Sequence, residues 1–235
     1  MNDKPTRRHR ASAVVVLIRG EGAGLETFWV RRSDGVSFMP GFRSFVGGVV
    51  DPADAELEIE GAEGQDRIER ACALREAFEE AGVLVGVERP GDAAALAEAR
   101  VRLLAGDATF PELVKAHGWR FRADALTRIG CWITPPFAPM RFETPYFLAR
   151  VPAGQDAHVR VGELADGEWI AQVEALRRWQ QGHESFAAPI LYTLLGLAHG
   201  EQGLAARLVE APEAAGQPAR RIEVKWGFVL VPLHT

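Results

Sequence analysis

Residues 75–83 read Arg-Glu-Ala-Phe-Glu-Glu-Ala-Gly-Val and place three carboxylates and one guanidinium at helical spacing. Residues three and four apart share a helix face, so Glu76, Glu79 and Glu80 converge on one patch, with Arg75 one turn from Glu79. Gly82 is a typical helix terminator, so Glu79 and Glu80 fall at the negative end of the helix dipole, where like charge is unfavourable. A hard divalent cation bound by carboxylate oxygens would turn this repulsion into affinity. The segment predicts a metal site, with a solvated, glutamate-rich surface helix as the alternative.

The surrounding elements would position these carboxylates. The run from Phe45 to Asp51 reads as a strand containing the glycine pair Gly47-Gly48. A helix is expected over roughly Asp66 to Ala81, because an apolar stripe recurs at helical spacing through Ile68, Ala71, Leu74, Phe78 and Ala81. We expect this stripe to pack on a sheet while the acidic face of the helix looks outward.

Together, the glycine pair and the run from Arg75 to Val83 resemble the Nudix box, and the chain is similar to the Nudix hydrolases over most of its length. The resemblance implies an α/β fold, a Nudix-type α/β/α sandwich with a mixed sheet. One departure lies in the middle of the box, where 26 residues separate Gly48 from Arg75. The extra part, about residues 51–65, reads as a polar, acidic loop. Arg67 falls where the first glutamate of the box is expected, and Glu63 and Glu69 are imperfect substitutes, so the bracing of the loop is in doubt.

The resemblance also implies the roles of the site residues. Glu76, Glu79 and Glu80 are the expected ligands of Mg²⁺ or Mn²⁺, with the carbonyl of Gly48 or Gly47 completing the shell. Glu76 or a loop glutamate would help to deprotonate the attacking water. Arg75 would pair with Glu79 or with the opening loop and hold the site in shape.

A further ligand is expected in the loop before Trp169. Many Nudix enzymes place a metal-binding glutamate several residues before a tryptophan, and this spacing selects Glu163. Glu143 is the reserve candidate. For either residue, a plain surface glutamate is the competing interpretation.

The implied activity is hydrolysis of the diphosphate linkage in a nucleoside diphosphate derivative. The box insertion, the Thr134-Pro135-Pro136 segment, the run from Arg141 to Thr144 and the C-terminal helix pair resemble the branch that includes the animal peroxisomal coenzyme A diphosphatase. Coenzyme A or acyl-coenzyme A is therefore the preferred substrate. ADP-ribose or a nucleotide sugar is the main alternative, and a catalytically silent Nudix-fold binding or regulatory module is the alternative from another class.

Several residues are candidates for substrate contacts. An added helical insertion at about residues 92–117 and the proline-rich segment after Trp132 could wall a groove for a long ligand arm. Aromatic side chains could stack on adenine, and arginines could bind the 3′-phosphate; the candidates are Trp132, Phe137, Phe142, Arg31, Arg32, Arg43 and Arg141.

Composition limits the class of protein. The chain has 235 residues, is 47% hydrophobic and 25% charged, and carries a net charge of −5, which suits one Nudix-like hydrolase domain over residues 1–235. The short basic cluster at Arg7, Arg8 and Arg10 reads as a solvated tail, so no nucleic acid partner is expected. The apolar run from Ala13 to Ile18 is too short for a membrane span. We expect a cytoplasmic protein without a membrane partner, with Cys72 and Cys131 as buried free thiols.

The remaining pattern alternates strands and helices. Ser12 to Ile18 and Leu25 to Arg31 form a predicted hairpin, residues 33–41 a loop, and Trp132 to Met140 an irregular segment because three prolines remove hydrogen-bond donors. Further elements are two helices within 92–117 broken around Gly106-Asp107 and Pro111, a strand over 141–151, helices over 173–181 and 187–199, and a strand pair or extended tail over 221–233.

The end of the chain looks like the first strand of a metallo-β-lactamase-type domain, so a fusion to such a domain is a hypothesis beside an ordinary edge strand. A homodimer is a further hypothesis.

Overall fold

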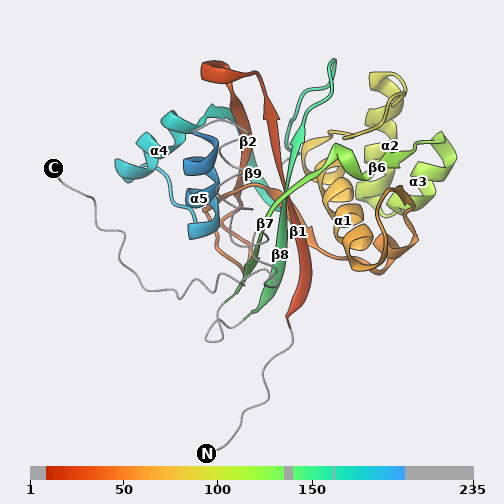
Figure 1. The fold of residues 1–235 in the computed structure, drawn as a ribbon, viewed down its shortest axis with the longest axis horizontal. Coiled ribbons are helices and arrows are strands. Elements are labelled where there is room, and N and C mark those ends of the chain that lie inside the picture. Colours follow the sequence, from red (N-terminus) through yellow and green to blue (C-terminus); the bar gives the residue numbers. More distant parts are fainter. Residues whose placement is uncertain (1–8, 135–139, 161, 199–235) are drawn as a thin grey trace, which may run out of the picture.

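The computed structural model describes residues 9–134, 140–160 and 162–198, and its described part is organised around a mixed β-sheet (Figure 1). The sheet contains β1 (Arg10–Arg19), β2 (Glu26–Arg32), β3 (Arg43–Ser44), β4 (Val46–Val49), β7 (Thr127–Ile133), β8 (Phe142–Arg150) and β9 (Leu164–Ala171). The order β3-β2-β1-β8-β7 forms the main path, with β4 paired to β1 and β9 paired to β2. Strands β1 and β8 are parallel, whereas the other pairs are antiparallel.

Helices cover both faces of this sheet. The helix α1 (Gly64–Ala81) lies on one side, with α2 (Ala93–Ala105) and α3 (Phe110–His117) beyond it, while α4 (Gln172–Gln180) and α5 (Ala188–Leu197) lie on the other (Figure 1). Each side has its own hydrophobic core: Phe78, Phe110 and Phe147 belong to the α1 side, and Trp29, Ile129 and Leu194 to the α5 side. The predicted α/β/α sandwich with a helical insertion and C-terminal helices is confirmed.

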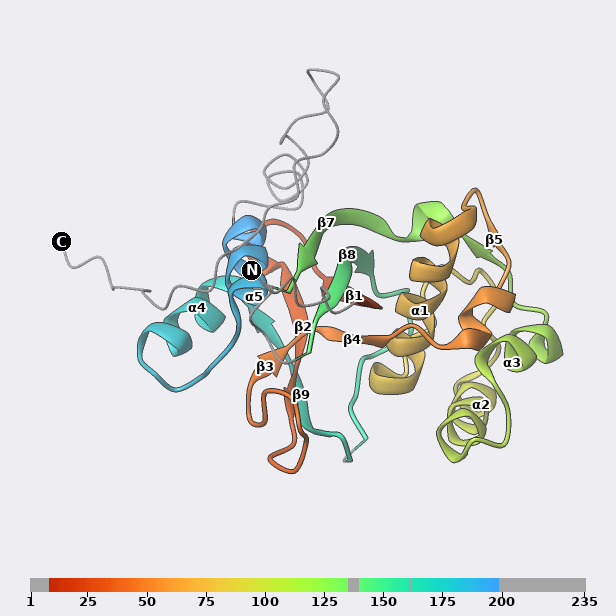
Figure 2. The same cartoon turned by 90° about the horizontal axis from the view of Figure 1, so that it is seen from below.

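The edge of β1 that faces away from β8 is shared by two strands. Residues 12–15 pair with β4, and residues 17–19 pair with β2. Strand β4 thereby passes beside α1, as Figure 2 shows. A Cβ atom on Gly47 would overlap the carbonyl oxygen of Ala13 and lie 2.8 Å from Val14 Cα, so the close approach of β4 to β1 requires glycine at this position.

The box insertion is structured, and the prediction of a polar, acidic loop over 51–65 is wrong. A 3-10 helix, η2 (Pro52–Glu56), follows β4, and β5 (Ile59–Glu60) pairs in parallel with β6 (Phe121–Arg122). Leu57 and Ile59 are buried in the α1-side core. These two apolar side chains alternate with charged residues, which is a strand pattern that the acidic composition obscured.

The helical insertion is confirmed as α2 and α3, broken at Gly106. Pro111 does not break a helix, because it lies in the first turn of α3, where a missing N–H costs nothing, behind a capping box formed by Thr109 and Glu112. The structure also confirms the hairpin, the loop over 33–41, the strand near 141–151 and the two later helices. Short 3-10 helices form at η1 (Gly22–Gly24) and η3 (Ala123–Ala125).

Two details of the proline-rich region differ from prediction. Trp132 and Ile133 are not irregular, because they end β7 and pair with Thr144 and Glu143 of β8. Cys131 is exposed rather than buried, whereas Cys72 is buried as expected. Residues 135–139 and the predicted C-terminal strand over 221–233 lie outside the described residues. Within the described part of the chain, the helices are too short or too polar to span a membrane.

Candidate active site

The last turns of α1 pack against the glycine pair of β4. Glu76 is only 8% exposed, and a Cβ atom on Gly48 would overlap its carboxylate. The backbone N–H of Gly47 donates to Glu80 Oε2 at 2.9 Å. The prediction that the acidic face looks outward is therefore wrong, because the missing side chains of Gly47 and Gly48 leave room for the carboxylates against the sheet.

Arg75 holds the acidic side chains together. Its Nη1 donates to Glu76 Oε1 at 2.8 Å and to Glu79 Oε2 at 2.7 Å, and its Nη2 donates to the Val49 carbonyl at 2.9 Å. The predicted partner Glu79 is thus present, whereas the main-chain partner Val49 is the last residue of β4 rather than a loop residue. Arg75 Nε donates to Asp54 Oδ1 at 2.9 Å, a contact that the sequence analysis missed.

Asp54 provides the bracing that the missing first glutamate of the box left in doubt. It is 1% exposed and lies in η2, where its Oδ2 accepts from the N–H of Asp51 at 2.8 Å. The neighbouring Ala53 N–H donates to Asp51 Oδ1, which completes a capping box. The spacing Asp51-Pro-Ala-Asp54 is a helix-start signal that could have marked this residue.

The residues considered as substitutes for that glutamate serve other purposes. Glu69 pairs with Arg128, and Glu63 occupies the N-cap position of α1 without a side-chain hydrogen bond. Arg67 donates to the Ala55 carbonyl at 2.9 Å, so it ties α1 to the inserted segment. The brace therefore comes from inside the insertion rather than from the start of α1.

The acidic site carries more negative charge than its surroundings neutralise. Burial raises the pKa of Glu76 to about 7, with Arg75 lowering and Glu79 raising it. Burial and the neighbouring Glu76 carboxylate raise the pKa of Glu80 well above its usual range, although the hydrogen bond from the Gly47 N–H lowers it. Burial also raises the pKa of Glu79. These directions mark carboxylates that lack compensating cations, because burial and like charge both disfavour the ionised form.

Arg75 is the main cation in this cluster. Burial alone would lower its pKa, but its hydrogen bonds and ion pairs with Asp54 and Glu76 outweigh burial and raise it. The single guanidinium is shared by the carboxyl groups of Asp54, Glu76 and Glu79, so it can neutralise only one of the three charges that full ionisation would produce.

The donor set fits a hard divalent cation. The glutamates supply carboxylate oxygens, and the Gly48 carbonyl, which accepts a long contact from the Cys72 thiol at 3.6 Å, supplies another oxygen beside them. Among the residues that the structure describes, no three His, Cys, Asp or Glu side chains are already arranged to hold a metal ion. Oxygens of Glu76 and Glu79 bond Arg75, and Glu80 bonds Gly47. The fit therefore rests on the chemistry of the donors and on their uncompensated charge.

A cavity of about 640 Å³ opens beside these carboxylates. Its acidic end includes Glu76, Glu80 and Glu163 next to the glycine pair. Glu163 raises the pKa of Glu80 and lies 3.1 Å from Arg32 Nη2. The reserve residue, Glu143, is not among the described residues that line the cavity, so the geometry favours Glu163 over Glu143.

The rest of the cavity wall is mostly apolar and aromatic. The side chains there come from the loop before β3, from β7 and β8 and from the start of α5, and include Phe38, Phe42, Phe45, Trp132, Tyr146 and Ile190. Trp132 thus lies where the sequence analysis placed it, on the cavity wall. Phe137 lies outside the described residues.

The predicted basic residues divide into two groups. Arg32 and Arg43 line the cavity. Arg31 and Arg141 are not among the described residues that line it; Arg31 Nε lies 3.4 Å from Asp166 Oδ2, and Arg141 Nε donates to the Thr134 carbonyl at 3.3 Å.

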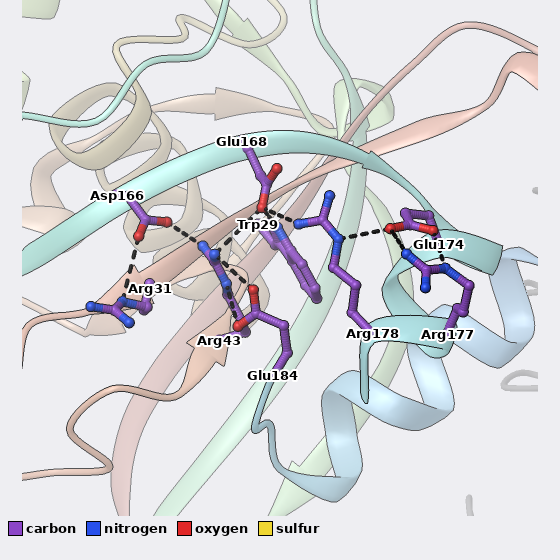
Figure 3. Close-up of polar contacts among 9 residues, drawn as sticks. All are labelled: Trp29, Arg31, Arg43, Asp166, Glu168, Glu174, Arg177, Arg178 and Glu184. Atoms are coloured by element: carbon purple, nitrogen blue, oxygen red, sulfur yellow. Dashed lines mark hydrogen bonds and ion pairs between the residues drawn. The ribbon is translucent and has the colours of Figure 1, made fainter. Parts of the chain in front are cut away.

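Arg43 is a structural brace rather than an unpaired cation. Its Nη2 and Nε donate to the two carboxylate oxygens of Glu184 at 2.9 and 3.0 Å, and Nη1 pairs with Asp166 (Figure 3). Its guanidinium also lies 4.9 Å from the centre of the Trp29 ring, and its backbone N–H donates to the Ser185 carbonyl at 2.8 Å. Arg43 therefore fixes the segment that enters α5, whose first residues line the cavity.

The helical insertion is away from this cavity. The described lining residues include none from 92–117, and α2 and α3 lie beyond α1 (Figures 1 and 2). The expectation that this insertion walls the ligand groove is therefore wrong for the described part of the chain. Phe110 and Leu113 instead pack in the α1-side core, which explains the apolar positions of α3.

Comparison with known proteins decides the family. The family model described as "NUDT19 Nudix domain" matches residues 60–197, which include all of α1 and both C-terminal helices. The chain belongs to the Nudix hydrolase family. The family named in this description belongs to the coenzyme A diphosphatase-like branch. The box insertion and the proline-rich segment of this chain resemble the same branch.

Individual Nudix proteins agree with this assignment. The crystal structure of a Nudix hydrolase from Alicyclobacillus acidocaldarius superposes with a TM-score of 0.73 at 30% identity, covering 84% of this chain and 96% of the other. "Putative nudix hydrolase 7" of Caenorhabditis elegans is 28% identical over 172 residues, which cover 72% of this chain. The alignment spans 54% of that protein, so the chain matches about half the length of this curated relative.

Proposed function

We propose that the chain hydrolyses the diphosphate linkage of a nucleoside diphosphate derivative with the help of Mg²⁺ or Mn²⁺. The observation that carries the proposal is the cluster of α1 carboxylates beside Gly47-Gly48: Arg75 bonds Glu76 and Glu79, Gly47 bonds Glu80, and Glu76 and Glu80 line the acidic end of the cavity. Nudix hydrolases generally use divalent metals and act on this class of substrate.

We assign a role in metal binding, proton transfer or positioning to each residue of the site. Glu76, Glu79, Glu80, Glu163 and the Gly48 carbonyl are proposed to hold the metal. When bound, the metal would neutralise the diphosphate and lower the pKa of a water molecule. Glu76, or Glu163 from the loop, would accept a proton from the attacking water at a carboxylate oxygen. The Arg75–Asp54 pair keeps the α1 carboxylates in place, since the guanidinium is bonded on both sides.

Coenzyme A or acyl-coenzyme A is the proposed substrate. The aromatic and apolar wall of the cavity would suit the long uncharged arm of such a ligand, with Trp132 as a contact surface. The two arginines that line the described cavity, Arg32 and Arg43, both have carboxylate partners. Because this leaves the binding of a 3′-phosphate without a dedicated cation there, ADP-ribose and nucleotide sugars remain the alternative substrates.

A panel of diphosphate compounds with product identification tests this proposal. Coenzyme A, acetyl-coenzyme A, ADP-ribose and a nucleotide sugar would be incubated with the protein and Mn²⁺, beside a chelator control. We expect adenosine 3′,5′-bisphosphate and a 4′-phosphopantetheine product from coenzyme A. A specificity constant for ADP-ribose above that for coenzyme A by about tenfold or more would overturn the coenzyme A assignment. No turnover of any compound would favour the binding or regulatory module.

Other expectations from the sequence extend this proposal. Residues 1–235 would form one hydrolase domain that works in the cytoplasm on a small-molecule substrate. A homodimer and a fusion to a metallo-β-lactamase-type domain remain hypotheses, which sedimentation and the sequence of the neighbouring coding region would test.

A further inference from the structure

The inserted helix α2 contributes one buried cation, Arg100, to the end of α1. Arg100 is 3% exposed. Its Nε donates to the Glu79 carbonyl oxygen at 3.0 Å, and its Nη2 donates to the Glu80 carbonyl oxygen at 2.7 Å. The side chain thus binds the main chain of two of the three α1 glutamates of the proposed metal site.

These contacts complete the C-terminus of α1. An α-helix leaves its last four carbonyl groups without partners inside the helix. In α1, the Phe78 carbonyl accepts from the Gly82 N–H at 3.1 Å, and the Ala81 carbonyl accepts from the His158 N–H at 2.9 Å. The other two carbonyls belong to Glu79 and Glu80, and both are bonded by Arg100.

The same guanidinium also holds the segment that precedes Glu163. Arg100 Nη2 donates to the His158 carbonyl at 3.1 Å, and Nη1 lies 2.9 Å from His158 Nε2. Because a guanidinium only donates hydrogen bonds, His158 Nε2 is the acceptor in this contact. Arg100 therefore connects the end of α1 with His158, five residues before Glu163 in the sequence.

The positive charge of Arg100 lies at the C-terminal end of α1. Its hydrogen-bond partners are three carbonyl oxygens and a ring nitrogen rather than a carboxylate. Burial lowers the pKa of Arg100 to about 10, with Arg160 lowering and Glu80 raising it, so the group is cationic at neutral pH. A cation at this place faces the negative end of the helix dipole and favours ionised glutamates in the last turn.

We infer that Arg100 is a positioning residue of the hydrolase: it fixes the main chain of Glu79 and Glu80 at the end of α1, tied to the backbone at His158, and so sets the spacing of the metal-binding carboxylates of this helix. The inference rests on the proposed function for its catalytic consequence. It also gives the helical insertion a role, because α2 supports the acidic helix from behind instead of lining the cavity.

Three variants test this inference. Arg100→Met removes the hydrogen bonds and keeps the apolar stem, Arg100→Lys keeps the charge with fewer donors, and Arg102→Met changes an exposed arginine on the same helix. Each variant would be compared with the parent in three measurements: Mn²⁺ binding by calorimetry without substrate, hydrogen exchange of the Gly82 and Val83 amides, and kcat and KM with coenzyme A.

For Arg100→Met, we expect Mn²⁺ affinity and kcat to fall by about 10- to 100-fold, as for other groups that orient metal ligands. KM should change by less than about twofold, because Arg100 does not line the cavity. The Gly82 and Val83 amides should exchange faster, while amides of β8 stay protected. Arg100→Lys should recover part of the loss, and Arg102→Met should match the parent.

Unchanged Mn²⁺ affinity and unchanged α1 exchange in Arg100→Met would overturn the inference. A lower melting temperature with unchanged kcat per folded molecule would also overturn it, because that result describes a structural role alone. If Arg100→Met does not fold, the same three measurements on Arg100→Lys decide. If the parent turns over no diphosphate, the proposed function fails, yet metal binding and exchange still test the positioning role.

Discussion

At the scale of residues, the site depends on one guanidinium that serves several carboxylates. Arg75 bonds Asp54, Glu76 and Glu79, and the glycine pair admits Glu76 and Glu80 against β4. Arg75, Glu76, Glu79 and Glu80 follow from the spacing of residues 75–83 alone. Asp54 does not, because it lies 21 residues before Arg75 and reaches it only through the fold of the insertion.

Asp54→Asn tests the brace. The amide keeps the shape of the side chain but removes the most deeply buried of the three charged partners of the Arg75 guanidinium. We expect a loss of about 3 kcal/mol in the free energy of unfolding, in the range measured for broken buried ion pairs, and a lower kcat. Chemical denaturation beside a rate measurement checks both. Glu56→Gln, an exposed neighbour in η2, is the matched control, and equal stability of the two variants would contradict the role of Asp54.

We predict that changing Gly48 to alanine lowers activity more than stability, and that changing Gly47 to alanine lowers stability. In Gly48→Ala, the new Cβ overlaps the carboxylate of Glu76, which can move, so activity should fall by more than about tenfold with a small change in melting temperature. In Gly47→Ala, the new Cβ meets the main chain of Ala13 and Val14, which cannot move without opening the sheet. This variant should lose stability by more than about 2 kcal/mol. Melting curves and rates of the pair would contradict the account if the two losses were interchanged.

At the scale of elements, local patterns predicted most helices and strands, whereas long-range contacts decided what they do. The periodicity of residues 66–81 identifies α1, and the break at Gly106-Asp107 separates the two helices of the insertion, α2 and α3. The acidic composition of residues 51–65 hid β5, because only two buried side chains, Leu57 and Ile59, carry the strand signal. The position of the helical insertion behind α1 could not be predicted, since amphipathic helices show which face is buried but not against what.

The brace at Arg43 makes a prediction for the segment that enters α5. Arg43 is buried and separated from Glu184 by 141 residues, so no local pattern pairs them. Arg43→Met should lower the free energy of unfolding by about 3–5 kcal/mol, because Glu184 would remain largely buried without its partner. The KM for coenzyme A should rise, since the start of α5 lines the cavity.

Arg31→Met is the control for this change. Arg31 pairs with the same Asp166 at 3.4 Å but is 41% exposed, so its loss should cost less than about 1 kcal/mol. Denaturation curves of the two variants, measured together, would contradict the brace if they coincided.

At the scale of the whole molecule, the helices that support the acidic helix and the side chains that wall the cavity lie on different sides of the sheet. The α1 side carries the inserted helices that hold the acidic helix, and the α5 side contributes aromatic and apolar walls to the cavity. The sheet between them carries the glycine pair that brings the carboxylates to the cavity edge. The family resemblance predicted this architecture, but the residues that wall the cavity from β7, β8 and α5 became apparent only in three dimensions.

Hydrolysis of coenzyme A by the parent protein and by Glu80→Gln, each with saturating Mn²⁺, tests the central claim most directly. Burial and the neighbouring Glu76 already raise the pKa of Glu80, so a neutral side chain should leave the melting temperature unchanged or higher. The account predicts a rate lower by about 100-fold or more at equal or greater stability, because the amide binds a hard cation poorly. Equal rates for the two proteins, at full Mn²⁺ occupancy, would contradict it.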